Sequence, residues 1–213
     1  MNIPQEMILK QIGIGPMANY AYFIGDAENK DVGIVDPGWD SKEIIKTAQK
    51  ENYNIIAILL THGHFDHITE VDNLAANFNC PVYISKQEYA HLNAKTIIKV
   101  NDHDKIKIGK IDIECVLTPG HTTGSQCFKY KNVLLTGDTL FLQGCGRCDL
   151  PGGNPKEMYH SLYNVLMRLP DDTIIFPGHA YSSKTCSTIA EQKKTNPYLM
   201  CKSEKEFLED FMG

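Results

Sequence analysis

The sequence lacks the features of membrane, secreted and nucleic-acid-binding proteins. No apolar run approaches the ~18 residues that suggest a membrane span. The first ten residues, MNIPQEMILK, contain no basic region followed by an apolar stretch, so no signal peptide is expected. Lys and Arg number 21 against 26 Asp and Glu, which gives a net charge of −5. No cluster of basic residues that would bind nucleic acid stands out in the sequence. We therefore expect a cytoplasmic protein that binds neither membrane nor nucleic acid.

Cysteine usage also excludes a disulfide-stapled domain. The seven cysteines are odd in number and scattered along a chain without a secretion signal. Cys145 and Cys148 form a CxxC, but no second CxxC and no thioredoxin-like context accompany it. The alternative interpretation of Cys145 and Cys148 is a redox pair or half of a zinc knuckle. We expect instead small, buried residues that line a pocket.

The pattern of apolar runs predicts a layered α/β domain. The 213 residues, 42% of them hydrophobic, suffice for one sizeable domain or two small ones. Runs rich in Ile, Val, Tyr and Phe predict strands at 7–14, 20–25, 32–36, 55–60, 81–85, 111–117, 125–130, 132–138 and 173–178. Helical periodicity occurs at 41–52, 67–78, 155–169 and 203–212, with Ser41 and Asn154 as caps. Strands and helices alternate at both ends around a strand-rich middle, which indicates mixed sheets.

A histidine-rich turn supplies the first chemical signal. Three of the eight histidines lie in THGHFDH (61–67), directly after the apolar run 55–60. Side chains at the carboxyl end of a strand lie in a crevice on rigid backbone. His62 and His64 can point to the same side, whereas Asp66 and His67 begin a helix and turn toward a second point. One heptapeptide thus offers ligands to two adjacent metal positions. Because zinc takes about four ligands from His, Asp and Cys, more are needed.

Three further candidates share the same local context. His121 in TPGHTTGS, Asp138 in TGDTLF and His179 in FPGHAY each follow a predicted strand and a turn containing glycine. A single histidine or aspartate in such a place is usually a surface or turn residue. The joint pattern of four matching segments indicates a metal site instead. The remaining histidines are expected to lie outside it: His91, His103 and His160.

In this order, the motifs HxHxDH, HTTGS, GDTLF and PGH resemble those of the metallo-β-lactamase superfamily, from Met7 to Leu199. The resemblance implies a four-layer αββα sandwich, of α/β (α+β) class, in which helices flank two mixed sheets with metals at one edge. It implies that His62, His64 and His121 bind one metal and that Asp66, His67 and His179 bind the second. Asp138 would bridge the two ions.

The chain is most similar to the glyoxalase II-like (hydroxyacylglutathione hydrolase-like) branch, which includes thioester hydrolases and persulfide dioxygenases. LFLQGCGRCDLPGG and EQKKTNPYL carry this resemblance. Two departures disfavour a glutathione thioester. The chain ends soon after TNPYL, so we expect one domain over 1–213 without the C-terminal helical domain of glyoxalase II, and CDLPGG replaces two aromatic residues. Similar short hydrolases occur with bacterial polyketide pathways, where carrier-bound acyl thioesters are candidate substrates.

These features together predict a dinuclear zinc-dependent hydrolase that cleaves an acyl thioester. Metal-bound hydroxide would attack the carbonyl, and Asp66 would orient the water or carry its proton. Arg147 is the candidate for recognising a substrate carboxylate or phosphate, with an ion pair to Asp149 as the alternative. Tyr181 would place a phenol at the rim of the site, or pack there. The expected partner is a small-molecule or carrier-bound thioester, and a homo-oligomer is possible.

An iron enzyme is the alternative reading of the same residues. A persulfide dioxygenase acting on glutathione persulfide with oxygen would use His62, His121 and Asp138 around one iron, because two histidines and a carboxylate suit iron(II). The Arg147 loop fits both enzymes. A metal-binding scaffold or sensor without turnover would be favoured by a degenerate ligand set, and no ligand position is missing here.

Overall fold

The computed structural model describes residues 2–211, and its strands form two six-stranded sheets. The first sheet mixes antiparallel pairing between β1, β2 and β3 with parallel pairing from β3 to β6. Its strands, in spatial order, are β1 (Met7–Ile14), β2 (Asn19–Asp26), β3 (Asp31–Val35), β4 (Asn54–Leu59), β5 (Val82–Ser85) and β6 (Ile97–Val100).

The second sheet is also mixed, because β10 and β13 run parallel whereas its other neighbours pair antiparallel. Its strands, in spatial order, are β14 (Ser187–Thr188), β13 (Ile174–Pro177), β10 (Val133–Gly137), β9 (Gln126–Tyr130), β8 (Ile111–Leu117) and β7 (Lys105–Ile108). A short hairpin joins β11 (Leu140–Phe141) to β12 (Gly144–Cys145).

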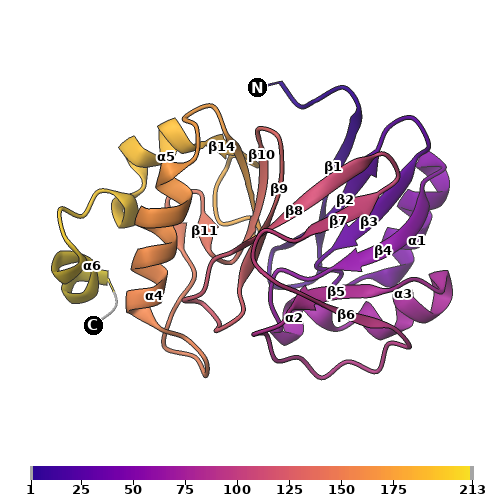
Figure 1. The fold of residues 1–213 in the computed structure, drawn as a ribbon, viewed down its shortest axis with the longest axis horizontal. Coiled ribbons are helices and arrows are strands. Elements are labelled where there is room, and N and C mark those ends of the chain that lie inside the picture. Colours follow the sequence, from indigo (N-terminus) through magenta and orange to yellow (C-terminus); the bar gives the residue numbers. More distant parts are fainter. Residues whose placement is uncertain (1, 212–213) are drawn as a thin grey trace.

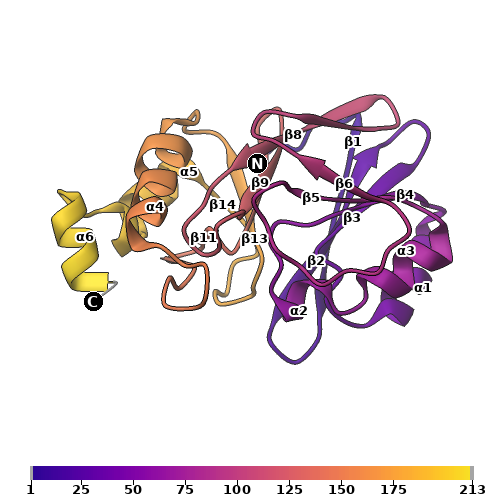
Figure 2. The same ribbon diagram turned by 60° about the horizontal axis from the view of Figure 1, so that its bottom comes forward.

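The helices lie on the outer faces of the two sheets. The first half of the chain forms α1 (Ser41–Glu51), α2 (Phe65–Ile68) and α3 (Val71–Phe78); the second half forms α4 (Pro155–His160), α5 (Ile189–Thr195) and α6 (Glu204–Phe211). Figures 1 and 2 both place α1 and α3 at one end of the molecule and α4, α5 and α6 at the other. Among the described residues, every helix is too short or too polar to cross a lipid bilayer.

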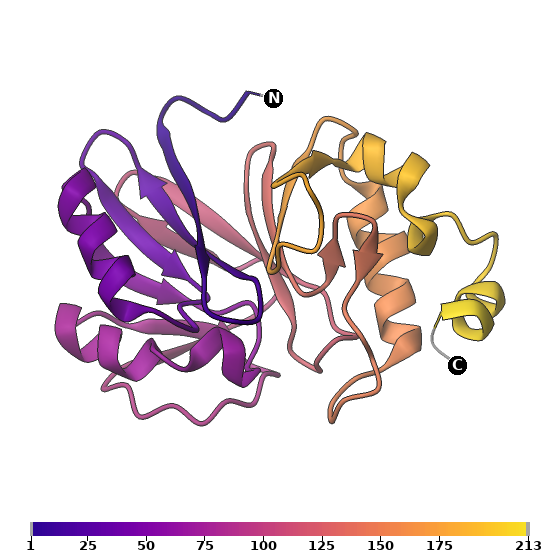
Figure 3. The same cartoon turned by 180° about the vertical axis from the view of Figure 1, so that it is seen from behind.

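Three apolar clusters separate four layers, which confirms the expected αββα sandwich. One cluster fills the space between the sheets and includes Tyr22, Leu59 and Phe128. A second packs α1 and α3 on the first sheet, and a third packs the C-terminal helices on the other sheet. The view from behind shows the same arrangement, with the sheets between the two groups of helices (Figure 3).

Most strands begin and end within two residues of their predicted positions, but the helices differ more. The predicted helix 67–78 is two helices, because the chain turns at 69–70, where the Glu70 N–H donates to the carbonyl of Pro37. The predicted helix 155–169 ends in a π-helical turn, Ser161–Val165, and a 3₁₀ turn, Leu166–Arg168. The predicted helix 203–212 corresponds to α6, and its last residue, Met212, lies outside the described residues.

The two predicted helix caps have opposite outcomes. The Asn154 side chain accepts hydrogen bonds from the N–H groups of Lys156 and Glu157, as a helix cap should. The prediction that Ser41 caps the first helix is wrong, because Asp40 occupies the N-cap position of α1, in a left-handed backbone conformation. The Asp40 carboxylate does not cap either, since it accepts from the N–H of Gly15.

Phe128 tests how far stability depends on the contact between the sheets. Its side chain is 0% exposed in the cluster between the sheets. Phe128→Ala should lower the free energy of unfolding by about 3–5 kcal/mol, because it removes buried apolar surface and leaves a cavity. Urea denaturation measures this change. Tyr89→Ala, at a side chain 74% exposed, is the control, and an equal loss in both variants would contradict the assignment of the core.

Candidate metal centre

Strand direction brings the predicted ligands to one edge of the sandwich. In the first sheet β3 and β4 are parallel, and the turn after β4 carries His62 and His64. In the second sheet β8, β10 and β13 share one direction, since β8 and β10 are each antiparallel to β9 and β13 is parallel to β10. Their carboxyl ends are followed by His121, Asp138 and His179. The backbone alone therefore collects the ligands at this edge.

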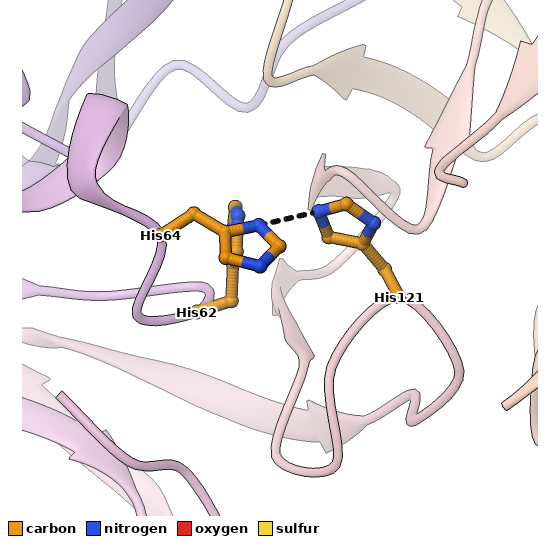
Figure 4. A group of neighbouring side chains, drawn as sticks. All are labelled: His62, His64 and His121. Atoms are coloured by element: carbon orange, nitrogen blue, oxygen red, sulfur yellow. Dashed lines mark hydrogen bonds between the residues drawn. The ribbon is translucent and has the colours of Figure 1, made fainter. Parts of the chain in front are cut away.

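The first group consists of His62, His64 and His121, whose ligand atoms all lie within 4.8 Å of one another. Figure 4 shows His62 and His64 on one turn and His121 reaching toward them from a loop on the other side. A hydrogen bond of 2.9 Å joins His64 Nδ1 to His121 Nε2. His62 and His121 are buried, whereas His64 is half-buried.

The second group consists of Asp66, His67 and His179, which are all buried. Their ligand atoms also lie within 4.8 Å of one another. Asp138 lies between the two groups. Its Oδ1 atom is 3.4 Å from His67 Nε2, and its Oδ2 atom is 3.2 Å from His179 Nε2 and 3.5 Å from His121 Nε2. The structure thus brings all seven predicted ligands together, with Asp138 shared.

Unused polar atoms indicate that the site fits metal ions. His62 Nε2 and Asp138 Oδ1 are buried and make no hydrogen bond to any described residue. Such atoms are costly in a protein interior unless a ligand satisfies them. Imidazole and carboxylate groups are the ligands that zinc and iron accept. Metal binding is therefore supported by the donor set itself.

Hydrogen bonds at the outer nitrogens orient the histidine rings. The Nδ1–H groups of His121 and His179 donate to the carbonyls of Arg147 and Met17, at 2.7 and 3.0 Å. His67 Nδ1 lies 3.1 Å from Asp36 Oδ2. These contacts leave Nε2 of each ring directed at the site, which is the arrangement that fixes metal-binding tautomers.

Burial and charge divide the histidines into two kinds. Burial lowers the pKa of His64 to about 4 and that of His62 well below its usual range. Both rings are therefore neutral near pH 7, the form that binds metals. Burial alone would also lower the pKa of His67, but Asp138 and Asp36 on either side raise it well above the usual value. Burial would raise the pKa of Asp138, yet His67 and His179 hold it well below its usual range.

A cavity of about 710 Å³ opens above this site. Its floor contains five of the seven ligands: His64, Asp66, His121, Asp138 and His179. Its walls are mostly apolar and come from both halves of the chain: Met17, Phe65, Phe141, Leu150 and Pro151. Both predicted substrate-binding residues, Arg147 and Tyr181, also line it. A substrate would therefore meet the ligands between apolar walls.

Arg147 and Tyr181 differ in how they are held. The Arg147 guanidinium donates two hydrogen bonds to the Asp149 carboxylate, at 2.6 and 2.5 Å, and its side chain is 63% exposed. The Tyr181 ring stacks on His179, with centroids 4.7 Å apart and 9° between the planes. Burial and the carboxylates of Asp138 and Asp66 raise the pKa of the Tyr181 phenol, so it stays a hydrogen-bond donor at neutral pH.

The CxxC pair lies beside the cavity as two free thiols. Cys145 lines the cavity and Cys148 is buried. Burial raises the pKa of the Cys148 thiol to about 12, which leaves almost no thiolate at neutral pH. The three histidines expected outside the site, His91, His103 and His160, are exposed.

Sequence reasoning missed buried residues that hold the ligands, among them Asp36 and Asn19. Asp36 follows β3 and accepts hydrogen bonds from the N–H and hydroxyl of Thr61 besides contacting His67. VGIVDPG has the same strand-then-turn context as the ligand segments, so a signal for Asp36 was present. The Asn19 amide donates to Asp66 Oδ2 at 2.9 Å, and its oxygen accepts from the Trp39 indole. No local pattern marks Asn19.

Comparison with known proteins agrees with this geometry. The model of the metallo-beta-lactamase superfamily matches residues 14–179, and with the fold and the clustered donors it shows that the chain is an enzyme of this superfamily. A relative in Bacillus subtilis, described as the probable polyketide biosynthesis zinc-dependent hydrolase PksB, is 33% identical over 89% of this chain and 85% of its own length.

Two further relatives are named ETHE1, and the name of one of them states a different activity. The mouse mitochondrial persulfide dioxygenase ETHE1 is 30% identical over 93% of this chain and 78% of its own length. The crystal structure of ETHE1 from Myxococcus xanthus superposes with a TM-score of 0.88 at 31% identity, covering 95% of this chain and 89% of the other. The family is thus established, while the two relatives named above for an activity differ: one is described as a zinc-dependent hydrolase and the other as a persulfide dioxygenase.

Asp36 offers a test of how the second group is held. Asp36→Asn keeps the size of the side chain but removes the charge beside His67, so zinc should bind at Asp66, His67 and His179 about 10–100-fold more weakly. Competition with a chromophoric chelator measures the dissociation constants. Asp31→Asn, at the opposite end of β3 and bonded only to Asn54 in the described contacts, is the matched control. Unchanged zinc binding in Asp36→Asn would contradict this role.

Proposed function

We propose that the protein is a dinuclear zinc-dependent hydrolase of the glyoxalase II-like branch that converts an acyl thioester and water into a carboxylic acid and a thiol. The observation that carries this proposal is that both ligand groups are complete and converge on one buried carboxylate, Asp138. His62, His64 and His121 would hold one ion, and Asp66, His67 and His179 the other. A relative described as a zinc-dependent hydrolase supports the choice of metal and reaction.

Bound zinc supplies Lewis acidity at the thioester carbonyl and hydroxide at neutral pH. The remaining tasks belong to the protein. Asp66 lines the cavity, and Asn19 fixes one of its carboxylate oxygens. We assign it the orientation of the attacking water and the transfer of its proton. The buried Asp138 keeps its negative charge and so balances the positive charge gathered at the site.

Substrate binding is assigned to the cavity walls. Phe65 and Tyr181 are 62% and 61% exposed at the cavity, and their apolar surface would be covered by the acyl group or the carrier arm of a thioester. Arg147 would bind a carboxylate or phosphate of the substrate at the mouth, exchanging Asp149 for the new anion. Exposed ion pairs contribute little to stability, so breaking the pair between Arg147 and Asp149 would cost little free energy. A small-molecule or carrier-bound thioester fits both features.

A persulfide dioxygenase is the second candidate, because the ETHE1 relatives, at 30% and 31% identity, are nearly as similar to this chain as the hydrolase relative at 33%. It would use His62, His121 and Asp138 for a single iron. These residues lie close together, with 4.9 Å between the His62 and His121 ring centroids and 3.5 Å from His121 Nε2 to Asp138 Oδ2. The remaining ligands would then serve only to hold the site.

Metal content separates the two candidates. Protein produced with both zinc and iron present and purified without oxygen should contain about two zinc ions per chain by elemental mass spectrometry, because both ligand groups are complete. It should then release thiol from acyl thioesters of glutathione, coenzyme A or carrier proteins without consuming oxygen. Asp66→Asn should reduce kcat at least tenfold if Asp66 handles a proton. One iron per chain, with oxygen uptake on glutathione persulfide, would replace the hydrolase proposal by the dioxygenase.

A further inference from the structure

Glu88 is a buried carboxylate that the proposed reaction does not use. It lies in the loop after β5 and is 8% exposed. Within the described part of the chain, no Lys, Arg or His forms an ion pair with it; Lys99 donates to the main-chain carbonyl of Glu88 rather than to its carboxylate. Carboxylates are rarely this buried unless they are paired or fully hydrogen-bonded. The partners of Glu88 therefore indicate its purpose.

Those partners are the two turns that carry the first ligand group. Glu88 Oε2 accepts hydrogen bonds from the Thr122 hydroxyl at 2.5 Å and from the Gly124 N–H at 3.1 Å, just after His121. The carboxylate also accepts from the N–H of Gly63, which stands between His62 and His64, and from the N–H of Tyr89. Burial raises the pKa of Glu88, and these donors oppose that effect.

Two glycines let the Glu88 segment approach both turns closely. A Cβ atom on Gly63 would lie 2.4 Å from the carbonyl of Tyr89 and 3.0 Å from Glu88 Oε1. A Cβ atom on Gly124 would lie 2.3 Å from the backbone nitrogen of Glu88. Any other residue at either position would push the segment away. The Glu88 segment is thus packed closely against two turns, one after β4 of the first sheet and one before β9 of the second.

We propose that Glu88 is a positioning residue of the metal centre, which clamps the turn of His62 and His64 to the turn of His121. If an amide replaces the carboxylate, one of the two acceptor oxygens becomes a donor, so some of the donors of the two turns lose their acceptor and the turns are free to separate. Preorganised ligands bind a metal more tightly than ligands that must first be brought together. Glu88 should therefore control affinity at the first position. The second group is held by Asp36 and Asn19, and Asp36 also accepts from Thr61, next to His62.

Glu88→Gln tests this role, because it keeps the shape but presents an amide to a ring of donors. The matched control is Glu114→Gln on β8, a partly buried carboxylate that accepts from His103 and Lys129 and does not line the cavity. Metal-free protein is titrated with cobalt(II), whose visible absorption distinguishes a position with three histidines from one with an aspartate and two histidines. Thermal unfolding of the metal-free proteins is measured alongside.

The expected result is that Glu88→Gln weakens cobalt(II) binding at the three-histidine position by about 10–100-fold and at the other position by less than about threefold. Glu114→Gln should leave both positions unchanged. Equal weakening at both positions, or no weakening, would overturn the proposal, since a merely structural role would not single out one position. If Glu88→Gln fails to fold, Thr122→Val removes one of the bonds to Glu88, together with the bond between the Thr122 and Ser125 hydroxyls, and should weaken the same position by a smaller factor.

This inference rests on the metal centre of the proposed function, not on its substrate. The titration contains no thioester, so a wild-type protein that binds cobalt(II) but cleaves no thioester would overturn the hydrolase and leave the role of Glu88 standing. Conversely, thioester cleavage with unaltered metal binding in Glu88→Gln would overturn the role of Glu88 and leave the hydrolase standing.

Discussion

The contact of the Asp138 carboxylate with histidines from both sheets is the interaction on which the rest of the site depends. Asp138 follows β10, which pairs with β9 on one side and β13 on the other, and it is 8% exposed. A carboxylate so buried would cost several kcal/mol if it were left without partners. His67 lies in α2, which follows β4 of the first sheet, whereas His121 and His179 follow strands of the second. The Asp138 carboxylate therefore gains all of its histidine partners only when the two sheets are packed together, and these contacts in turn stabilise that packing.

The sequence predicts much of this site because the ligands lie in repeated local contexts. Each predicted ligand segment follows an apolar run and contains a glycine turn, and strand direction then brings the segments to one edge. The αββα fold was predictable for a related reason, since the resemblance rests on the same segments in the same order. The shared position of Asp138 was expected from the resemblance rather than from any local pattern, and the structure places its carboxylate between the two groups.

The parts that escaped prediction depend on contacts between distant residues. Glu88 and Thr122 are 34 positions apart, and Asn19 and Asp66 are 47 apart. No periodicity in the sequence records such pairs. The strands β6 and β7 were missed because they are short and carry exposed lysines at edge positions. The seven-residue helix α5 offers less than two full turns of pattern. The break between α2 and α3 comes from a bond to the loop after β3.

The arrangement of the ligands on turns from both sheets makes metal binding part of the folding equilibrium. The residues that form the site span most of the sequence, from Met17, whose carbonyl orients His179, to His179 itself. In the unfolded chain these groups are far apart, so a metal binds the native state almost exclusively and adds its binding free energy to stability. The supply of metal in a cell would thus set how long this protein resists unfolding and proteolysis, besides whether it is active.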